Sequence, residues 1–324
     1  MAGLPNRLPC SPVLVVLLLG LGAATVSSLF MTLGVVGNWD FVLPFRGAKL
    51  AGLVIVACGI AISTILFQTV TNNRILTPGI MGFDALFALI QTCLVFAKGA
   101  VAASAVSANL LFAVEVAIMT LFSTALFGAL FSGMTRSLHL TMLVGVVGGI
   151  FFRSLSALMQ RMISPNEFVV LQDRLFASFN TTHGELLVAS AIAIMVAAVS
   201  AWRLSPTLDV LSLGRETAIN LGVDHRRTVM TVLVLVSILV SVSTALVGPV
   251  TFLGLLVASL ARQIVPSARH VHLLPAAAAL AVVGLVGGQM ALERVFGFAT
   301  ALSIIVEFVG GIVFIVLVLK GAAR

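Results

Sequence analysis

The sequence predicts an all-α membrane protein, a helix bundle with about ten transmembrane helices, and three observations support this. The mean hydropathy is +1.21 over 324 residues. Only 9% of the residues are charged, too few to cover the surface of a water-soluble globule. The apolar residues also form runs of about 20, the length that crosses a bilayer as a helix. These runs continue through the whole chain, so we expect a single domain over residues 1–324.

The expected spans follow one another in chain order. They cover residues 13–36, 50–70, 79–97, 106–130, 140–160, 185–202, 228–247, 250–265, 275–292 and 301–319. The first run resembles a signal peptide but has no clear small-residue cleavage site, so we expect it to be retained. The apolar stretch 228–265 is too long for one crossing. Gly248 and Pro249 predict a turn within it, with Pro249 opening the next helix.

The distribution of Lys and Arg predicts that both termini are cytoplasmic. With that orientation the inner side holds more basic residues than the outer side. The inner residues are Arg7, Arg74, Arg136, Arg203, Arg215, Arg226, Arg227, Arg262, Arg269, Lys320 and Arg324, and the outer ones are Arg46, Lys49, Lys98, Arg153, Arg161, Arg174 and Arg294. The longest inner loop is then the polar segment at about 203–227.

Ionisable residues inside the expected spans are costly unless they are paired or face water. Glu115 and Glu307 are two such residues, and three roles remain open for them: lining a pathway, structural hydrogen bonding, and proton transfer. Asp84 follows the sequence "LTPG", so its carboxylate is expected near the positive end of a helix. Glycines at helical spacing, at 145 and 149 and at 284 and 288, predict close helix packing.

Signatures of an enzyme are absent from the sequence. It contains no GxxxxGK[ST] phosphate-binding loop, so any ATP would have to be hydrolysed by another chain. The cysteines Cys10, Cys58 and Cys93 are scattered. His270 and His272 share a loop without further ligands at metal-binding spacing. We therefore expect this chain to bind no cofactor itself.

Four segments, in order, resemble the FecCD-type permeases of ABC importers for iron chelates and cobalamin. They are "TNNRILTPGIMGFDALFALIQT" at 71–92, "LGRETAINLG" at 213–222, "GPVTFLGLLVASLAR" at 248–262 and "RHVHLLP" at 269–275. The resemblance extends over nearly the whole chain. It implies the architecture of a type II ABC importer permease in the bacterial inner membrane.

The same resemblance implies two contact sites. The inner loop would fold into two short helices joined at a glycine, which dock on the ATPase subunit; Gly222 permits a sharp reversal, and charged side chains can contact a soluble partner. The implied ATPase-coupling residues are Arg215, Glu216, Ala218, Gly222, Arg226 and Arg227. On the outer face, Arg46, Lys49 and Arg294 are implied to dock the binding protein.

The implied function is import of a ferric siderophore. The implied partners are a second permease subunit, two copies of an ABC ATPase that use ATP and Mg²⁺, and an extracytoplasmic substrate-binding protein. Ala258 and Ser259 stand where the family often has Pro-His, which resembles a subgroup whose permeases form heterodimers and favours a heterodimer over a homodimer. The alternative function is a proton-coupled secondary transporter that uses Glu115 and Glu307.

Overall fold

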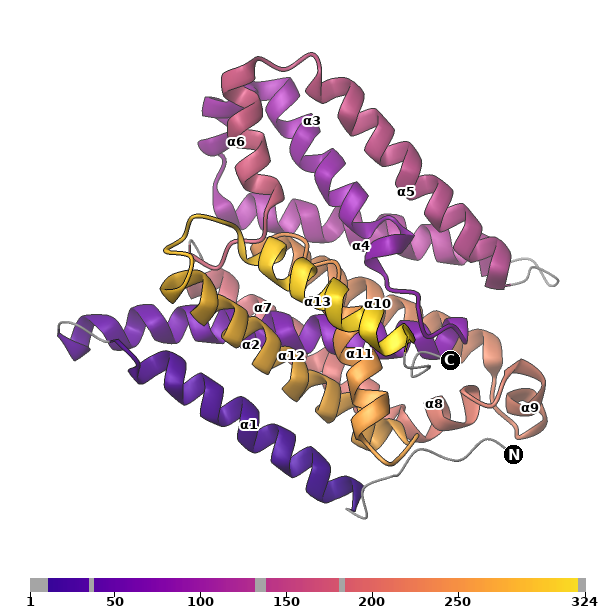
Figure 1. Ribbon diagram of the computed structural model, residues 1–324. Coiled ribbons are helices and arrows are strands. Elements are labelled where there is room, and N and C mark those ends of the chain that lie inside the picture. Colours follow the sequence, from indigo (N-terminus) through magenta and orange to yellow (C-terminus); the bar gives the residue numbers. More distant parts are fainter. Residues whose placement is uncertain (1–10, 35–37, 132–137, 181–183, 320–324) are drawn as a thin grey trace.

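The computed structural model describes residues 11–34, 38–131, 138–180 and 184–319, and all the regular elements within these ranges are helical (Figure 1). This confirms the all-α prediction. The elements are α1 (Pro12–Thr32), α2 (Trp39–Thr71), the 3₁₀ turn η1 (Gly79–Met81), α3 (Phe83–Ser104), α4 (Ala108–Phe131), α5 (Leu138–Gln160), α6 (Pro165–Leu175), α7 (Gly184–Arg203), α8 (Ser205–Leu211), α9 (Arg215–Asn220), α10 (His225–Val247), α11 (Leu253–Ile264), α12 (His270–Arg294) and α13 (Leu302–Leu319).

Eight helices in the described part of the chain are long and apolar enough to cross a membrane. They are α1, α2, α3, α4, α5, α7, α10 and α12. Two further apolar helices, α11 and α13, are shorter, so ten apolar helices stand where ten spans were predicted. The 12 residues of α11 rise only about 18 Å, less than the hydrocarbon thickness of about 30 Å. Helix α11 is therefore shorter than the span predicted at 250–265.

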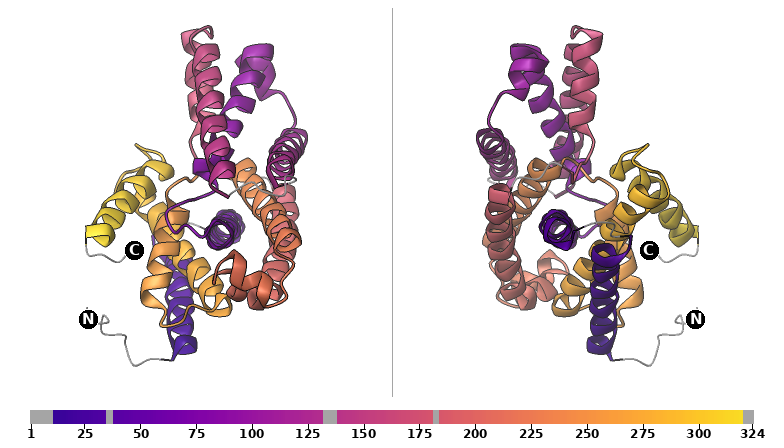
Figure 2. Two further views of the ribbon diagram at one scale, coloured as in Figure 1. Left: turned by 90° about the vertical axis from the view of Figure 1, so that its right-hand side faces the viewer. Right: turned by 90° about the vertical axis from the view of Figure 1, so that its left-hand side faces the viewer.

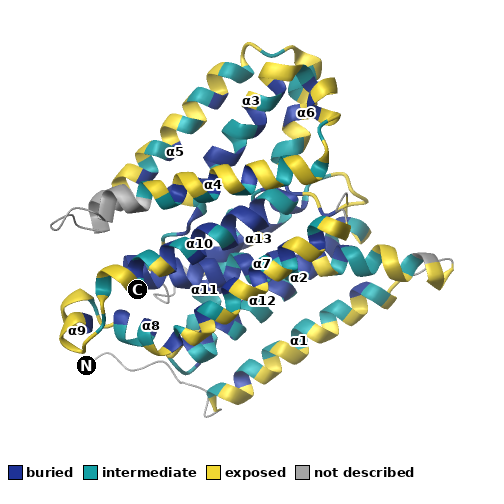
Figure 3. Cartoon of the chain, turned by 180° about the vertical axis from the view of Figure 1, so that it is seen from behind, coloured by how far each residue is buried: buried dark blue, intermediate teal, exposed yellow. Residues whose placement is uncertain are grey.

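Helix α2 lies near the centre of the bundle, where it packs against α10, α12, α7 and α11 (Figure 2). Its side chains Leu53, Val56 and Ile65 are fully buried. Figure 3 shows the buried residues gathered on α2, α10, α11 and α12, while α1, α4 and α5 expose much of their surface. That exposed apolar surface is what lipid or another membrane subunit would cover.

Helices α3, α5 and α6 form a group beside this core (Figure 1). The turn η1 approaches α5 through glycines: a Cβ added to Gly149 would lie 3.0 Å from the Cα of Gly82. Gly145 similarly faces Met81. The close packing predicted for Gly145 and Gly149 is therefore confirmed.

Two boundaries differ from the prediction. Helix α2 begins at Trp39, capped by Asn38, not at residue 50, so Arg46 and Lys49 lie inside it. Pro249 does not open α11, which begins at Leu253. Gly248 does reverse the chain, with φ +97° and backbone atoms of Ala177 so near that a Cβ would approach to 3.1 Å.

Helix α6 was not predicted. It lies between two expected spans, and five of its 11 residues are polar or charged. A signal was nevertheless present in the sequence. Ser164 caps the helix by accepting from the backbone N–H of Glu167, and Pro165 stands in its first turn, the arrangement that commonly starts a helix.

Candidate functional site

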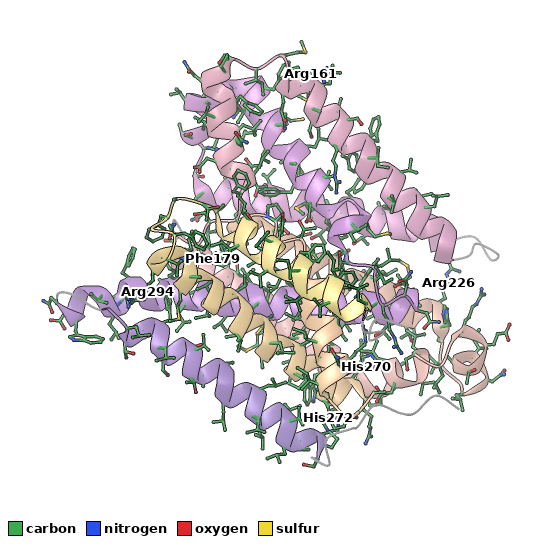
Figure 4. The ribbon with its side chains drawn as sticks, viewed as in Figure 1. Arg161, Phe179, Arg226, His270, His272 and Arg294 are labelled. Atoms are coloured by element: carbon green, nitrogen blue, oxygen red, sulfur yellow. The ribbon has the colours of Figure 1, made fainter. Side chains whose placement is uncertain are left out.

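The polar loop at 203–227 folds into the two short helices α8 and α9. They lie at the end of the molecule opposite to Arg294, and Arg226 marks this end in Figure 4. Helix α8 packs into the bundle with Leu208 and Leu211 buried, whereas Ala218 is the buried residue of α9. Helix α8 thus anchors the loop to the bundle, and α9 forms the exposed tip of the loop.

Glycines stand at both ends of α9. Gly214 has φ +100° and joins α8 to α9, while Gly222 has φ +85° and joins α9 to α10. A Cβ at either position would meet no atom within 4 Å, so the need for glycine here comes from the backbone angle rather than from crowding. Gly222 was predicted from the sequence, whereas Gly214, the joint between the two short helices, was not.

The tip presents both charged and apolar side chains. Arg215, Glu216, Arg226 and Arg227 are all exposed. Three apolar side chains accompany them and were not predicted: Leu213, Ile219 and Leu221 are 60%, 50% and 60% exposed. Such a mixture suits contact with a protein partner, because apolar side chains supply burial and the charges set the orientation.

Two of the three cations predicted on the outer side converge on the end of α1. Arg46 donates from Nη1 to the carbonyl oxygens of Phe30 and Leu33, each at 2.9 Å. Arg294 also donates to the carbonyl of Leu33. These guanidinium groups satisfy carbonyls that the end of a helix leaves without intrahelical partners.

Lys49 differs from the other two cations. Its ammonium lies 2.9 Å from Oε1 of Glu293 on α12, and the residue is only 6% exposed. Gln289 donates to the same carboxylate oxygen at 2.8 Å. Lys49 is therefore engaged inside the protein, while Arg294 is exposed and Arg46 half-buried.

The two predicted pathway carboxylates have different surroundings. Glu115 is 2% exposed and accepts a 2.6 Å hydrogen bond from Nε2 of Gln91. Arg174 of α6 lies beside them, 3.5 Å from the Gln91 carbonyl oxygen. The hydrogen bond from Gln91 to Glu115 thus joins α3 to α4, as expected if the role of Glu115 is structural hydrogen bonding.

Glu307, by contrast, is exposed on α13. It lies within electrostatic range of Asp84, which stands in the first turn of α3 as predicted. Thr251 and Arg153 of α5 are further polar neighbours of Asp84. These polar groups from α3, α5 and α13, together with the segment before α11, bring charge to membrane depth at one place.

A metal centre is not evident in the part of the chain that the structure describes. No group of three or more His, Cys, Asp and Glu side chains there lies close enough to hold an ion. His272 is paired with Ser267, at 3.2 Å between Nδ1 and Oγ.

Comparison with known proteins places these features in context. Residues 11–320 match the model of the FecCD transport family. The chain is 48% identical to the petrobactin import system permease protein YclO of Bacillus subtilis, over 88% of this chain and 90% of that protein. It is 37% identical to the petrobactin import system permease protein FatC of Bacillus anthracis, over 86% of this chain and 78% of that protein.

A solved structure has the same fold. A metal-chelate type ABC transporter in an inward-facing conformation superimposes with a TM-score of 0.83, covering 96% of this chain and 100% of that one at 22% identity.

Proposed function

The chain belongs to the FecCD transport family, and from that premise we propose that it is the membrane-spanning permease of an ATP-driven importer for a ferric siderophore. The observation that carries the substrate class is the similarity, over most of the chain, to two petrobactin permeases. A siderophore of the petrobactin type is accordingly the first substrate to test. The chain is a transport subunit in the cell membrane, not an enzyme, and we place both termini in the cytoplasm.

Energy enters through another subunit in this proposal. The sequence has no phosphate-binding loop, so a pair of ABC ATPase subunits would bind and hydrolyse MgATP. The tip of α9, with Glu216 and its apolar neighbours, would dock in the ATPase. Its charges favour one orientation, and Gly214 and Gly222 hold its angle to the bundle.

A second permease subunit would complete the translocation path. Apolar side chains of α5 and α13 are left uncovered by the described part of the chain: Ile150, Phe151, Phe308 and Ile312 are all exposed. Glu307 stands among them on α13, where contact with lipid would be costly. An interface between two permeases would line a polar path with Glu307 and bury the apolar residues. We favour a heterodimer because of Ala258 and Ser259, with a homodimer as the alternative.

The outer face would receive the binding protein. Arg294 and Arg46 are the cations that remain accessible there, and they can meet carboxylates on the lobes of the partner. Lys49 belongs to the same cluster but would act from beneath the surface, by holding the ends of α2 and α12 together through Glu293.

The proton-coupled alternative has less support. The comparisons give relatives among ABC importers, and Glu115 is buried against Gln91 rather than facing an open path. We expect uptake to persist when the proton gradient is collapsed and ATP is maintained.

Reconstitution tests the proposed function directly. The permease is co-expressed with its second permease and ATPase, placed in proteoliposomes, and supplied with the binding protein loaded with radioactive ferric petrobactin. We expect ATP-dependent uptake. Gly222→Val should abolish uptake while leaving the protein in the membrane, because a β-branched residue resists positive φ. Glu216→Arg should weaken co-purification of the ATPase by charge reversal.

Conservative substitutions serve as matched controls. Gly222→Asn should retain much of the uptake, since Asn tolerates the left-handed region better than other residues, and Glu216→Gln should keep most of the ATPase contact. Normal uptake by both Gly222→Val and Glu216→Arg would mean that the loop is only a solvated connection.

A further inference from the structure

A buried polar network links the anchor helix of the coupling loop to two transmembrane helices. It consists of Asp209 on α8, His270 at the start of α12 and Thr69 near the end of α2. His270 is only 3% exposed and Thr69 7%. The sequence analysis treated His270 as a loop histidine and did not consider Asp209 or Thr69.

Asp209 makes two contacts with the same residue. Its Oδ1 accepts from the backbone N–H of His270 at 2.8 Å and lies 2.6 Å from the imidazole Nδ1. Helix α12 has no side-chain cap of its own from Arg269 and no acidic residue in its first turn. A carboxylate from α8 thus supplies the cap and the negative charge that favour a helix N-terminus.

His270 also forms a hydrogen bond with α2. Its Nε2 lies 2.8 Å from Oγ1 of Thr69, and the Thr69 hydroxyl lies 2.8 Å from the carbonyl of Ile65. The hydroxyl has one proton to donate. When the His270 ring is neutral, the Thr69 hydroxyl donates to its Nε2. When the ring is protonated, the hydroxyl accepts from Nε2–H and donates to the carbonyl of Ile65. His270 joins α8 to α2 in both protonation states.

The helices that receive this connection are fastened to each other again at their far ends. Lys49 of α2 and Glu293 of α12 form the outer ion pair. At 1.5 Å per residue, Lys49 is about 30 Å from Thr69 along α2, and Glu293 is about 34 Å from His270 along α12. Between the two links the antiparallel helices are in contact and bury small side chains such as Ala57, Ala61, Ala277 and Ala281. Close packing and two polar links make the pair a stiff unit.

We propose that Asp209 and His270 are positioning residues that transmit displacement of the coupling loop to the α2–α12 pair, and through it to the outer face. The inference rests on the proposed docking of α9 on an ATPase. Without the Asp209 contact, α8 could shift against the bundle when the ATPase closes, and the signal would be lost at the loop. The network therefore sets how tightly ATP hydrolysis responds to the loaded binding protein, which is a coupling free energy between two sites.

The test compares basal and stimulated ATP hydrolysis in the reconstituted complex. Asp209→Ala and His270→Ala should still co-purify with the ATPase and keep basal hydrolysis. Stimulation by the loaded binding protein should fall at least about fivefold, the lower end of usual coupling between sites. Asp209→Asn should restore part of it, because an amide oxygen still accepts from His270. Thr69→Val should lose the α2 link, whereas Thr69→Ser should keep it.

His272→Ala is the matched control, since this second histidine of the same helical turn pairs with Ser267 rather than with α8 or α2. It should respond normally. Full stimulation in Asp209→Ala and Thr69→Val, with Gly222→Val inactive, would overturn this inference and leave the coupling loop intact. Normal uptake in Gly222→Val would instead remove the proposed function on which it rests. If the alanine variants fail to assemble, Thr69→Val, which preserves side-chain shape, decides the question.

Discussion

Lys49 and Glu293 illustrate what one charged residue requires inside this protein. The ammonium is nearly inaccessible, and the carboxylate is shared with Gln289. Phe45 and Phe298 lie on either side, with ring centres 5.5 Å from the Lys49 nitrogen. Removing one partner from such a pair leaves an uncompensated charge, which costs more than the pair itself contributes.

Lys49→Met should therefore lower the free energy of unfolding by about 3 kcal/mol, the lower part of the range for a broken buried ion pair, because Glu293 keeps some exposure. SDS titration of the purified protein in mixed micelles measures the change. The double variant Lys49→Met, Glu293→Leu should recover more than half of the loss. A double variant no more stable than Lys49→Met alone would contradict the pair as the cause.

A second residue-scale prediction concerns Arg294 and the binding protein. Arg294→Glu should weaken binding-protein affinity about fivefold at low ionic strength, the effect of roughly 1 kcal/mol from an exposed ion pair, and less at high salt. Arg161→Glu is the control, because Figure 4 places Arg161 at a separate corner of the molecule. Arg294→Gln checks for damage to the α1 contact. Equal effects of the Arg294 and Arg161 reversals in affinity measurements would count against docking at Arg294.

At this scale the sequence identified charges but not their partners. The Lys and Arg count predicted Arg46, Lys49 and Arg294 on the outer side, and the family resemblance grouped them as one docking site. Glu293 lies 244 residues from Lys49, and nothing in a linear pattern of charges pairs residues so far apart. The buried Asp209–His270 contact was missed for the same reason.

Individual helices are positioned by the absence of side chains as much as by their presence. In α5, Gly149 faces the backbone of η1 so closely that a Cβ would lie 3.0 Å from the Cα of Gly82, whereas a Cβ on the neighbouring Gly148 would meet nothing within 4 Å. Two adjacent glycines thus have opposite requirements.

Gly149→Ala should destabilise the protein by about 1–3 kcal/mol through overpacking against η1. Gly148→Ala should be neutral or should stabilise it by up to about 1 kcal/mol, since Ala favours helix and has room here. The SDS midpoints of the two variants give the comparison. Equal gain in both would show that helix propensity, not contact with η1, decides the outcome.

Hydropathy predicted most helices because it reports which segments can face lipid or the apolar core. It could not predict where an apolar segment bends or stops, which depends on contacts with other helices. The short α11 follows from the turn at Gly248, which packs against Ala177. The polar α6 gives no hydropathy signal, and its Ser-Pro start was the one local clue.

The whole molecule has two opposite ends. Figure 4 shows Arg294 at one and Arg226 at the other, and the predicted orientation makes them outer and inner. Residues 1–10 and 320–324, where the expected cytoplasmic termini lie, are outside the described residues.

Single-cysteine labelling tests this orientation. In a variant with Cys10, Cys58 and Cys93 replaced by Ser, a membrane-impermeant maleimide should label cysteines placed at Met162 and Gly297 in intact cells. Cysteines at Asn220 and Ala268 should react only after permeabilisation. All four positions are exposed, so accessibility within the protein does not bias the result. The reverse pattern would invert the topology.

At this scale, the surface through which the subunits contact each other could not be predicted from the sequence. The apolar runs of α5 and α13 look alike in hydropathy whether lipid or protein covers them. Only the placement of Glu307 on the same exposed surface separates these cases, and that requires the fold.

The outer ion pair also has a consequence for the time order of biosynthesis. Lys49 leaves the ribosome 244 residues before Glu293, which is about 10 to 50 s at usual elongation rates. During that interval α2 is already in the bilayer with a cation that has no final partner. The unpaired Lys49 is tolerated in the bilayer because it lies near one end of its helix, where its long side chain reaches the phosphate headgroups. Glu293, the partner of Lys49, enters the membrane with α12. Insertion of α12 is therefore the step that commits the nascent chain to its final fold.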